Sequence, residues 1–197
     1  MARTLLLYSS VYGLSRQICE RIAALLAAGG AQPTVMALTD PAVDLGAHDA
    51  IVIGASIKHG KHQPTVLEFI RRHQAALCER PGALFSVNLV ARKPGKNTPQ
   101  TNPYLQALLR QSPWKPALMG VFAGELNYAR YGPFDRQMVR FIMWLTGGPT
   151  DLTTNKQFTD WAEVERFAAR ITAIALPTAP GVAASPATPV ASIGLAA

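Results

Sequence analysis

Residues 4–30 read TLLLYSSVYGLSRQICERIAALLAAGG, and this stretch decides the fold class. Thr4–Tyr8 is a short apolar run typical of a buried strand. After a turn of small and polar residues, an apolar stripe recurs at helical spacing, with the members Leu14, Ile18, Ile22, Leu25 and Leu26. The stripe stops at Gly29–Gly30, where a helix end is favoured. A strand that passes directly into an amphipathic helix predicts the start of a parallel α/β sheet.

The rest of the chain continues this alternation. Further strands are predicted at Pro33–Leu38, Ala50–Gly54, Ala83–Asn88 and Leu118–Gly124. Helices are predicted from about Gln63 to Leu77, from Thr101 to Arg110, and from a cap at Thr159 or Asp160 to about Ala175. Five strands that alternate with helices predict a doubly wound α/β domain with a five-stranded parallel sheet.

Two segments fall outside the alternation. Residues 125–155 interrupt it after the fifth strand, and Lys156–Phe158 is predicted as a strand that resumes the sheet. Residues 177–197 are rich in Ala, Pro, Ser and Thr without periodicity, so we expect a disordered tail there. One domain is therefore expected over residues 1–176.

The net charge of +7 is concentrated in one part of the chain. Between Ser86 and Gly124 no acidic residue occurs, and the basic residues are Arg92, Lys93, Lys96, Arg110 and Lys115. Such a segment suits an anionic lipid, a nucleic acid or a carboxylated ligand, and a solubilising surface explains it equally well. Because no recognition motif accompanies the basic residues, we expect no nucleic-acid partner.

The turn after the first strand offers a site for a phosphate. The N-terminus of a helix carries unpaired N–H groups and the positive end of the helix dipole. Ser10 and Ser15 add hydroxyl groups, and Gly13 permits close approach of the backbone. Neither the P-loop pattern nor the G-x-G-x-x-G pattern is present. An ordinary turn with a serine N-cap fits these residues equally well.

Three loops at the carboxyl ends of strands strengthen the case for a ligand, because doubly wound sheets bind ligands at this edge. They are the run GASIKHG at 54–60, the run SVNLVARK at 86–93 and the segment from Gly124. The turn Ser10–Ser15 resembles the phosphate loop of flavodoxins, and the order of elements matches their fold over residues 3–176. The runs at 52–62, 86–104 and 147–161 resemble one branch in particular: the flavodoxin-like, menaquinone-dependent protoporphyrinogen dehydrogenases of bacterial haem biosynthesis.

The resemblance implies FMN as the cofactor, with its phosphate on the turn and its ring system bordered by the loops. The implied cofactor residues are Ser10, Val11, Tyr12, Gly13, Leu14, Ser15, Ala55, Ser56, Ile57, Ser86, Val87, Asn88, Leu89, Val90, Ala91 and Gly124. Electron-carrier flavodoxins have a hydroxyl residue just before the glycine and a polar residue just after it. Here Tyr12 and Leu14 stand at these positions, so we expect one phosphate contact fewer.

The resemblance also implies oxidation of protoporphyrinogen IX to protoporphyrin IX, with electrons passed to menaquinone or ubiquinone. The substrate carries propionate carboxylates, for which Arg92, Lys93 and Lys96 are the candidate partners. A solvated basic loop is the alternative. His59 and His62 lack a third ligand for a metal site, and we assign no general base.

The insertion at 125–155 is predicted to hold a helix from Pro133 to Gly147. Its apolar residues are Phe134, Met138, Phe141, Ile142 and Leu145, whereas Arg136 and Arg140 mark another face. A helix of this length is about 21 Å long, too short to span a bilayer. We expect it to contact a quinone or the membrane surface, and a helix packed on the sheet is the alternative.

The leading expectation is therefore a peripheral enzyme at the cytoplasmic face of the bacterial inner membrane. A flavodoxin-type electron carrier is the main alternative, although such carriers present an acidic surface around the flavin and this segment is basic. A generic quinone reductase is a third possibility, although no segment marks a nicotinamide site.

Overall fold

The computed structural model describes residues 1–145 and 147–175, so the predicted tail at 177–197 lies outside the described residues. Five parallel strands form the sheet in the order β2-β1-β3-β5-β6. Their bounds are β1 (Arg3–Ser9), β2 (Gln32–Ala37), β3 (Ala50–Lys58), β5 (Gly82–Asn88) and β6 (Leu118–Ala123). The winding reverses between β1 and β3, as a doubly wound sheet requires. The predicted fold class is confirmed.

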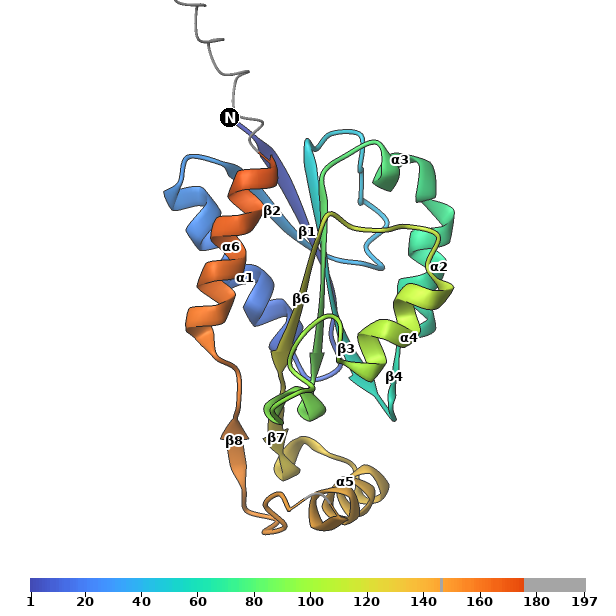
Figure 1. Cartoon of the computed structure of the whole chain (residues 1–197), viewed down its shortest axis with the longest axis vertical. Coiled ribbons are helices and arrows are strands. Elements are labelled where there is room, and N and C mark those ends of the chain that lie inside the picture. The colour runs from blue at the N-terminus through green and yellow to red at the C-terminus, as the bar shows by residue number, and fades with distance from the viewer. Residues whose placement is uncertain (146, 176–197) are drawn as a thin grey trace, which may run out of the picture.

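Helices cover both faces of the sheet (Figure 1). One face carries α1 (Leu14–Ala28) and α6 (Trp161–Ala175). The other carries α2 (Pro64–Arg72), α3 (Gln74–Cys78) and α4 (Pro103–Gln111). Asp160 directly precedes α6, and its carboxylate accepts hydrogen bonds from the backbone N–H groups of Ala162 and Glu163.

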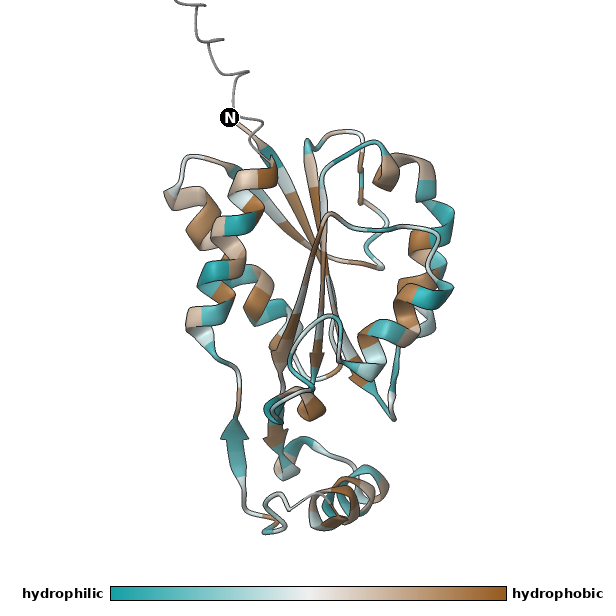
Figure 2. Cartoon of the chain, viewed as in Figure 1, coloured by the Kyte–Doolittle hydropathy of each residue, from teal (hydrophilic) through white to brown (hydrophobic). Residues whose placement is uncertain are grey.

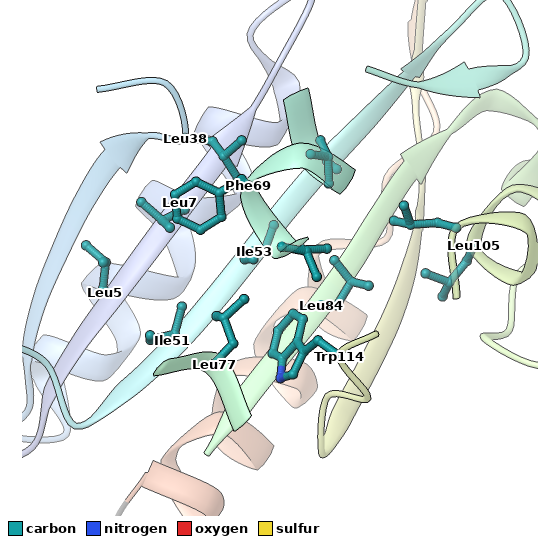
Figure 3. Close-up of a cluster of buried hydrophobic side chains, with 14 of the residues drawn as sticks. Leu5, Leu7, Leu38, Ile51, Ile53, Phe69, Leu77, Leu84, Leu105 and Trp114 are labelled. Carbon is teal, nitrogen blue, oxygen red and sulfur yellow. The ribbon is translucent and has the colours of Figure 1, made fainter. Parts of the chain in front are cut away.

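The alternation of side chains along each strand divides the core into two layers. Leu5 and Leu7 of β1 point to the layer under α2, α3 and α4, which Figure 3 shows with Phe69 and Trp114 among its members. Leu6 between them points to the opposite layer, under α1 and α6. Both faces of the inner strands β1, β3 and β5 are buried over most of their length, so these strands read as continuous apolar runs.

Three predicted elements differ from the structure. The third strand does not end at Gly54 but continues to Lys58, because Ala55 and Ser56 still pair with β5 and the two-residue strand β4 (Lys61–His62) pairs antiparallel with its last two residues. The helix predicted from Gln63 to Leu77 is two helices, α2 and α3, interrupted at His73, whose φ of −108° and ψ of 21° are not helical. The strand predicted at 156–158 is β8 (Asn155–Gln157), and it does not resume the sheet.

The strand β8 does not join the parallel sheet because it pairs antiparallel with β7 (Glu125–Asn127), which follows β6 almost directly. Between them lie a 3-10 helix, η2 (Tyr128–Arg130), and α5 (Pro133–Leu145). This insertion lies beyond the carboxyl ends of the parallel strands, at the lower end of Figure 1. It has a core of its own, made by Leu126, Tyr128, Tyr131 and Met143.

Helix α5 is apolar on two sides. Met143 is buried in the core of the insertion, whereas several large apolar side chains are exposed: Phe134, Phe141, Ile142, Trp144 and Leu145. Figure 2 shows hydrophobic residues on α5 although this helix lies away from the sheet. The alternative of a helix packed on the sheet is therefore wrong. Among the helices of the described part of the chain, none is long and apolar enough to cross a bilayer.

Candidate active site

A cavity of about 530 Å³ lies at the carboxyl edge of the sheet. Four segments line it: the turn after β1, the β3–β4 hairpin, the segment after β5, and the insertion with α5. The three loops singled out in the sequence therefore meet at one place, and the insertion forms a further wall.

The turn between β1 and α1 is held by short polar contacts. The hydroxyl of Ser10 accepts a hydrogen bond from the backbone N–H of Gly13 at 3.0 Å, and that of Ser56 accepts one from the N–H of Val11 at 3.2 Å. Gly13 has a φ of +94°, in the left-handed region that favours glycine. These contacts fix the backbone of the turn without a ligand.

The same turn fits an anion such as a phosphate. Gly13 is the N-cap of α1, so no side chain caps this helix, and its first turn holds no acidic residue. The hydroxyl of Ser15 is buried and has no hydrogen-bond partner. A Cβ built on Gly13 would meet no atom within 4 Å, so the space beside this backbone is open. An unpaired hydroxyl, free helix N–H groups and open space together suit a phosphate group.

Most predicted cofactor residues line the cavity: Ser10, Tyr12, Leu14, Ser56, Ile57, Val87, Asn88, Leu89, Val90 and Gly124. The others do not line it, namely Val11, Gly13, Ser15, Ala55, Ser86 and Ala91. Ala55 and Ser86 are fully buried. Ala55–Ile57 belongs to β3 and not to a loop, because Ala55 and Ser56 pair with β5 and Ile57 pairs with β4.

A buried polar network supports the wall after β5, and no local sequence pattern indicated it. The Nε2 of His62 lies 2.9 Å from the hydroxyl oxygen of Ser86, to which the side chain of Asn88 also donates. Asn88 and Asn102 bond through their amides, and Asn102 donates to the backbone carbonyl of Lys96 at 2.8 Å. Burial lowers the pKa of His62 to about 4, so this ring is neutral at physiological pH.

This network fixes the segment that carries the basic residues. Asn88 accepts a hydrogen bond from the N–H of Ala91 at the start of the 3-10 helix η1 (Leu89–Arg92). Asn102 accepts one from the N–H of Leu105 and so caps α4. The chain from 89 to 96 is therefore anchored at both ends by two buried asparagines.

The three predicted substrate residues, Arg92, Lys93 and Lys96, all line the cavity. Arg92 is the most enclosed: it donates to the backbone carbonyl of Leu89 at 3.0 Å, and burial lowers its pKa. Two further cations that were not predicted, Lys58 and Arg130, line the same space. The cavity is therefore lined by cations on several of its walls.

The insertion contacts the rest of the site through Asp135, at the start of α5. The Nε2 of His59 lies 2.7 Å from Oδ1 of Asp135, and the Tyr12 hydroxyl donates to Oδ2 at 3.4 Å. The hydrogen bond from His59 is the main cause that lowers the pKa of Asp135. These partners are 76 and 123 residues apart in the chain, so no local pattern could have paired them.

A five-stranded doubly wound sheet in the order β2-β1-β3-β5-β6 is the flavodoxin-like arrangement. Residues 5–153 match the flavodoxin domain family, and the chain belongs to this family, which implies a flavin cofactor. The crystal structure of oxidised flavodoxin 1 from Bacillus cereus aligns with 87% of this chain and 97% of its own, at 13% identity and a TM-score of 0.48.

Curated relatives identify the particular group of flavodoxin-like proteins to which the chain is similar in sequence. Protoporphyrinogen IX dehydrogenase [quinone] of Leishmania major is 41% identical over 180 residues, which are 90% of this chain and 78% of the relative. The protein of the same name from Escherichia coli (strain K12) is 41% identical over 172 residues, 86% of this chain and 94% of the relative. The chain belongs to the family of quinone-dependent protoporphyrinogen IX dehydrogenases. The predicted family and the prediction of an enzyme are confirmed, and the electron-carrier alternative is disfavoured.

Proposed function

We propose that this chain oxidises protoporphyrinogen IX to protoporphyrin IX with FMN as its cofactor and passes the electrons to menaquinone or ubiquinone. The observation that carries the proposal is the composition of the cavity. A turn suited to phosphate, a basic segment and an apolar helix face border one space of about 530 Å³. These are the features that a flavin phosphate, propionate groups and a largely apolar ring system would require.

The proposal specifies FMN because the turn suits a terminal phosphate. The unpaired hydroxyl of Ser15 and the open space at Gly13 lie at the N-terminus of α1, where an anion is stabilised by the helix dipole. When bound, the flavin supplies the capacity to accept two electrons and release them to a quinone. The chain itself supplies binding, orientation and charge.

The substrate would lie in a cavity that offers both positive charge and apolar surface. Lys93 and Lys96 line the cavity after β5, where they can pair with carboxylates. Helix α5 contributes apolar side chains to the same cavity, namely Met138, Val139, Ile142 and Met143. Cations together with an apolar wall suit a macrocycle that carries carboxylates at one edge.

The direct test is an anaerobic assay of the purified protein loaded with FMN. We expect protoporphyrin fluorescence to develop from protoporphyrinogen on repeated turnover only when a quinone is present. A pure electron carrier would give no fluorescence, and a generic quinone reductase would oxidise a nicotinamide cofactor instead. Either result would refute the proposed activity.

The basic segment gives a prediction about substrate binding. Arg92→Gln and Lys93→Gln should each raise the KM for protoporphyrinogen about tenfold, because a hydrogen bond to a charged group contributes about 1.5–3 kcal/mol. Steady-state kinetics measure this effect, and a flavin titration should show unchanged FMN affinity. Arg110→Gln is the matched control, since it removes an exposed charge of the same segment outside the cavity. Unchanged KM in both site variants would contradict a propionate role.

The exposed side of α5 gives a prediction about membranes, and we propose peripheral attachment at the cytoplasmic face of the bacterial inner membrane. Phe141, Trp144 and Leu145 are each more than half exposed. Their joint replacement by serine should weaken binding to anionic liposomes at least about tenfold, because interfacial binding scales with buried apolar area. Sedimentation with vesicles measures the loss.

FMN content should survive this triple replacement, because none of the three side chains lines the cavity. Met138→Ser is the matched control, since Met138 belongs to the same helix but lines the cavity. This control should disturb turnover and leave vesicle binding intact. Full vesicle binding by the triple variant would contradict a membrane role.

A further inference from the structure

Tyr12 joins the phosphate turn to the insertion through three different contacts. Its hydroxyl donates to Asp135 at 3.4 Å, and its ring packs against that of Tyr131 with centroids 5.1 Å apart. Its backbone carbonyl accepts a hydrogen bond from the guanidinium of Arg130 at 2.8 Å. One residue of the turn therefore contacts three residues of a segment more than a hundred positions away.

Asp135 also contacts the β3–β4 hairpin. His59 contacts its Oδ1 at 2.7 Å, and the Nζ of Lys58 lies 3.8 Å from its Oδ2. The Asp135 side chain is only 18% exposed. His59 has a φ of +48°, a strained conformation for this residue at the tip of the hairpin. The start of α5 is thus fastened to two walls of the cavity.

The turn itself contains no positive side chain over Ser10–Ser15. The next residue, Arg16, does not line the cavity and forms an ion pair with Glu20 at 2.7 Å. A helix N-terminus offers only about half a positive charge, less than a flavin phosphate carries in negative charge. Arg130 lines the cavity and lies within hydrogen-bond distance of the turn.

We propose that the insertion completes the flavin site. Arg130 supplies the positive charge that the phosphate turn lacks. Tyr12, whose hydroxyl is held by Asp135, positions the Arg130 guanidinium. This inference rests on the FMN site proposed above. The Arg130 guanidinium is also 3.7 Å from Glu125 at the root of the insertion, which limits where the arginine can lie. Because the phosphate and the insertion contact the same turn, binding of FMN and docking of the insertion stabilise each other.

The test compares two flavins that differ only in the phosphate. The full-length apoprotein is titrated with FMN and with riboflavin, and quenching of flavin fluorescence gives each Kd. Arg130→Gln should raise the Kd for FMN about tenfold, as expected for one hydrogen bond to a charged group at a half-exposed site. The Kd for riboflavin should change less than about twofold. Arg140→Gln, which removes a positive charge from the exposed side of α5, should change neither Kd.

Two further variants separate charge from packing. Arg130→Lys keeps the charge, so its loss of FMN affinity should be clearly smaller than that of Arg130→Gln. Asp135→Asn should weaken FMN binding in the wild-type protein but not further in the Arg130→Gln background, because a positioning residue acts through the residue that it positions. Far-UV circular dichroism of each apoprotein checks that the fold is retained.

Three results would overturn the inference. The first is an unchanged Kd for FMN in Arg130→Gln. The second is an equal rise of the Kd for FMN and for riboflavin in that variant. The third is an equal rise of the Kd for FMN in Arg130→Lys and Arg130→Gln. A wild-type protein that binds FAD in preference to FMN would refute the cofactor itself, and that failure is recognised without any variant.

Discussion

Gly13→Val is expected to abolish FMN binding, with a Kd at least about 100-fold higher than that of the wild type. The phosphate would be held by several charge-assisted hydrogen bonds, each contributing about 1.5–3 kcal/mol, and loss of two is sufficient for this change. The branched side chain would project into the open space beside the turn. The φ of +94° is also a conformation that β-branched residues avoid. Flavin absorbance of the purified protein and titration of the apoprotein measure the loss.

Gly30→Val is the matched control at the other end of the same helix. Gly30 has a φ of +84°, and a Cβ there would likewise meet no atom within 4 Å. The variant therefore carries similar backbone strain without approaching the cavity, and it should bind FMN normally. Full flavin absorbance in Gly13→Val would show that the phosphate lies elsewhere. Equal losses in both variants would point to distortion of α1 and not to the site.

Acidification from pH 7 to pH 4 is expected to lower the free energy of unfolding by about 3 kcal/mol through His62 alone. The pKa of His62 is about 4 in the folded protein, compared with 6.5 for an unperturbed histidine. Between these values the unfolded chain binds a proton that the folded chain does not bind. Stability is therefore fully present above pH 6.5, declines as the pH falls, and reaches its lower level below about pH 4.

Urea unfolding of the wild type and of His62→Gln across this pH range isolates the contribution. Other titrating groups are common to both proteins, so they cancel in the difference between the two curves. The variant should be less stable at pH 7, because Ser86 loses one of its two hydrogen-bond partners, but it should lose less stability on acidification. Parallel curves for the two proteins would contradict a buried neutral histidine.

The order of strands and helices could be predicted because it depends on local periodicity. Buried strands give short apolar runs and α1 gives a stripe at helical spacing, so each element is marked within its own residues. The extension of β3 to Lys58 could not be predicted in this way. Its end is stabilised by pairing with Lys61 and His62, and neither residue is apolar or typical of a strand.

In the candidate site, too, the segments that are continuous in the chain could be predicted, and the contacts between distant residues could not. The phosphate turn and the basic segment are continuous in the chain, and the resemblance placed them at one edge of the sheet. The contacts of Asp135 with Tyr12 and His59, and the network of His62, join residues far apart in the chain. Such pairs are formed only by the tertiary fold. The burial of a single residue such as His62 therefore could not be predicted from its neighbours in the chain.

The short ribbon of β7 and β8 determines how this active site can change. Phe158 donates its backbone N–H to the carbonyl of Gly124, so the chain leaves and re-enters the domain at neighbouring points. A segment with adjacent ends can be lengthened, shortened or exchanged at small entropic cost, and the parallel sheet keeps its order. The parallel sheet can therefore keep its backbone while the insertion varies in length and sequence. Substitutions on α5 can change the lining of the cavity while the strands of the sheet stay the same.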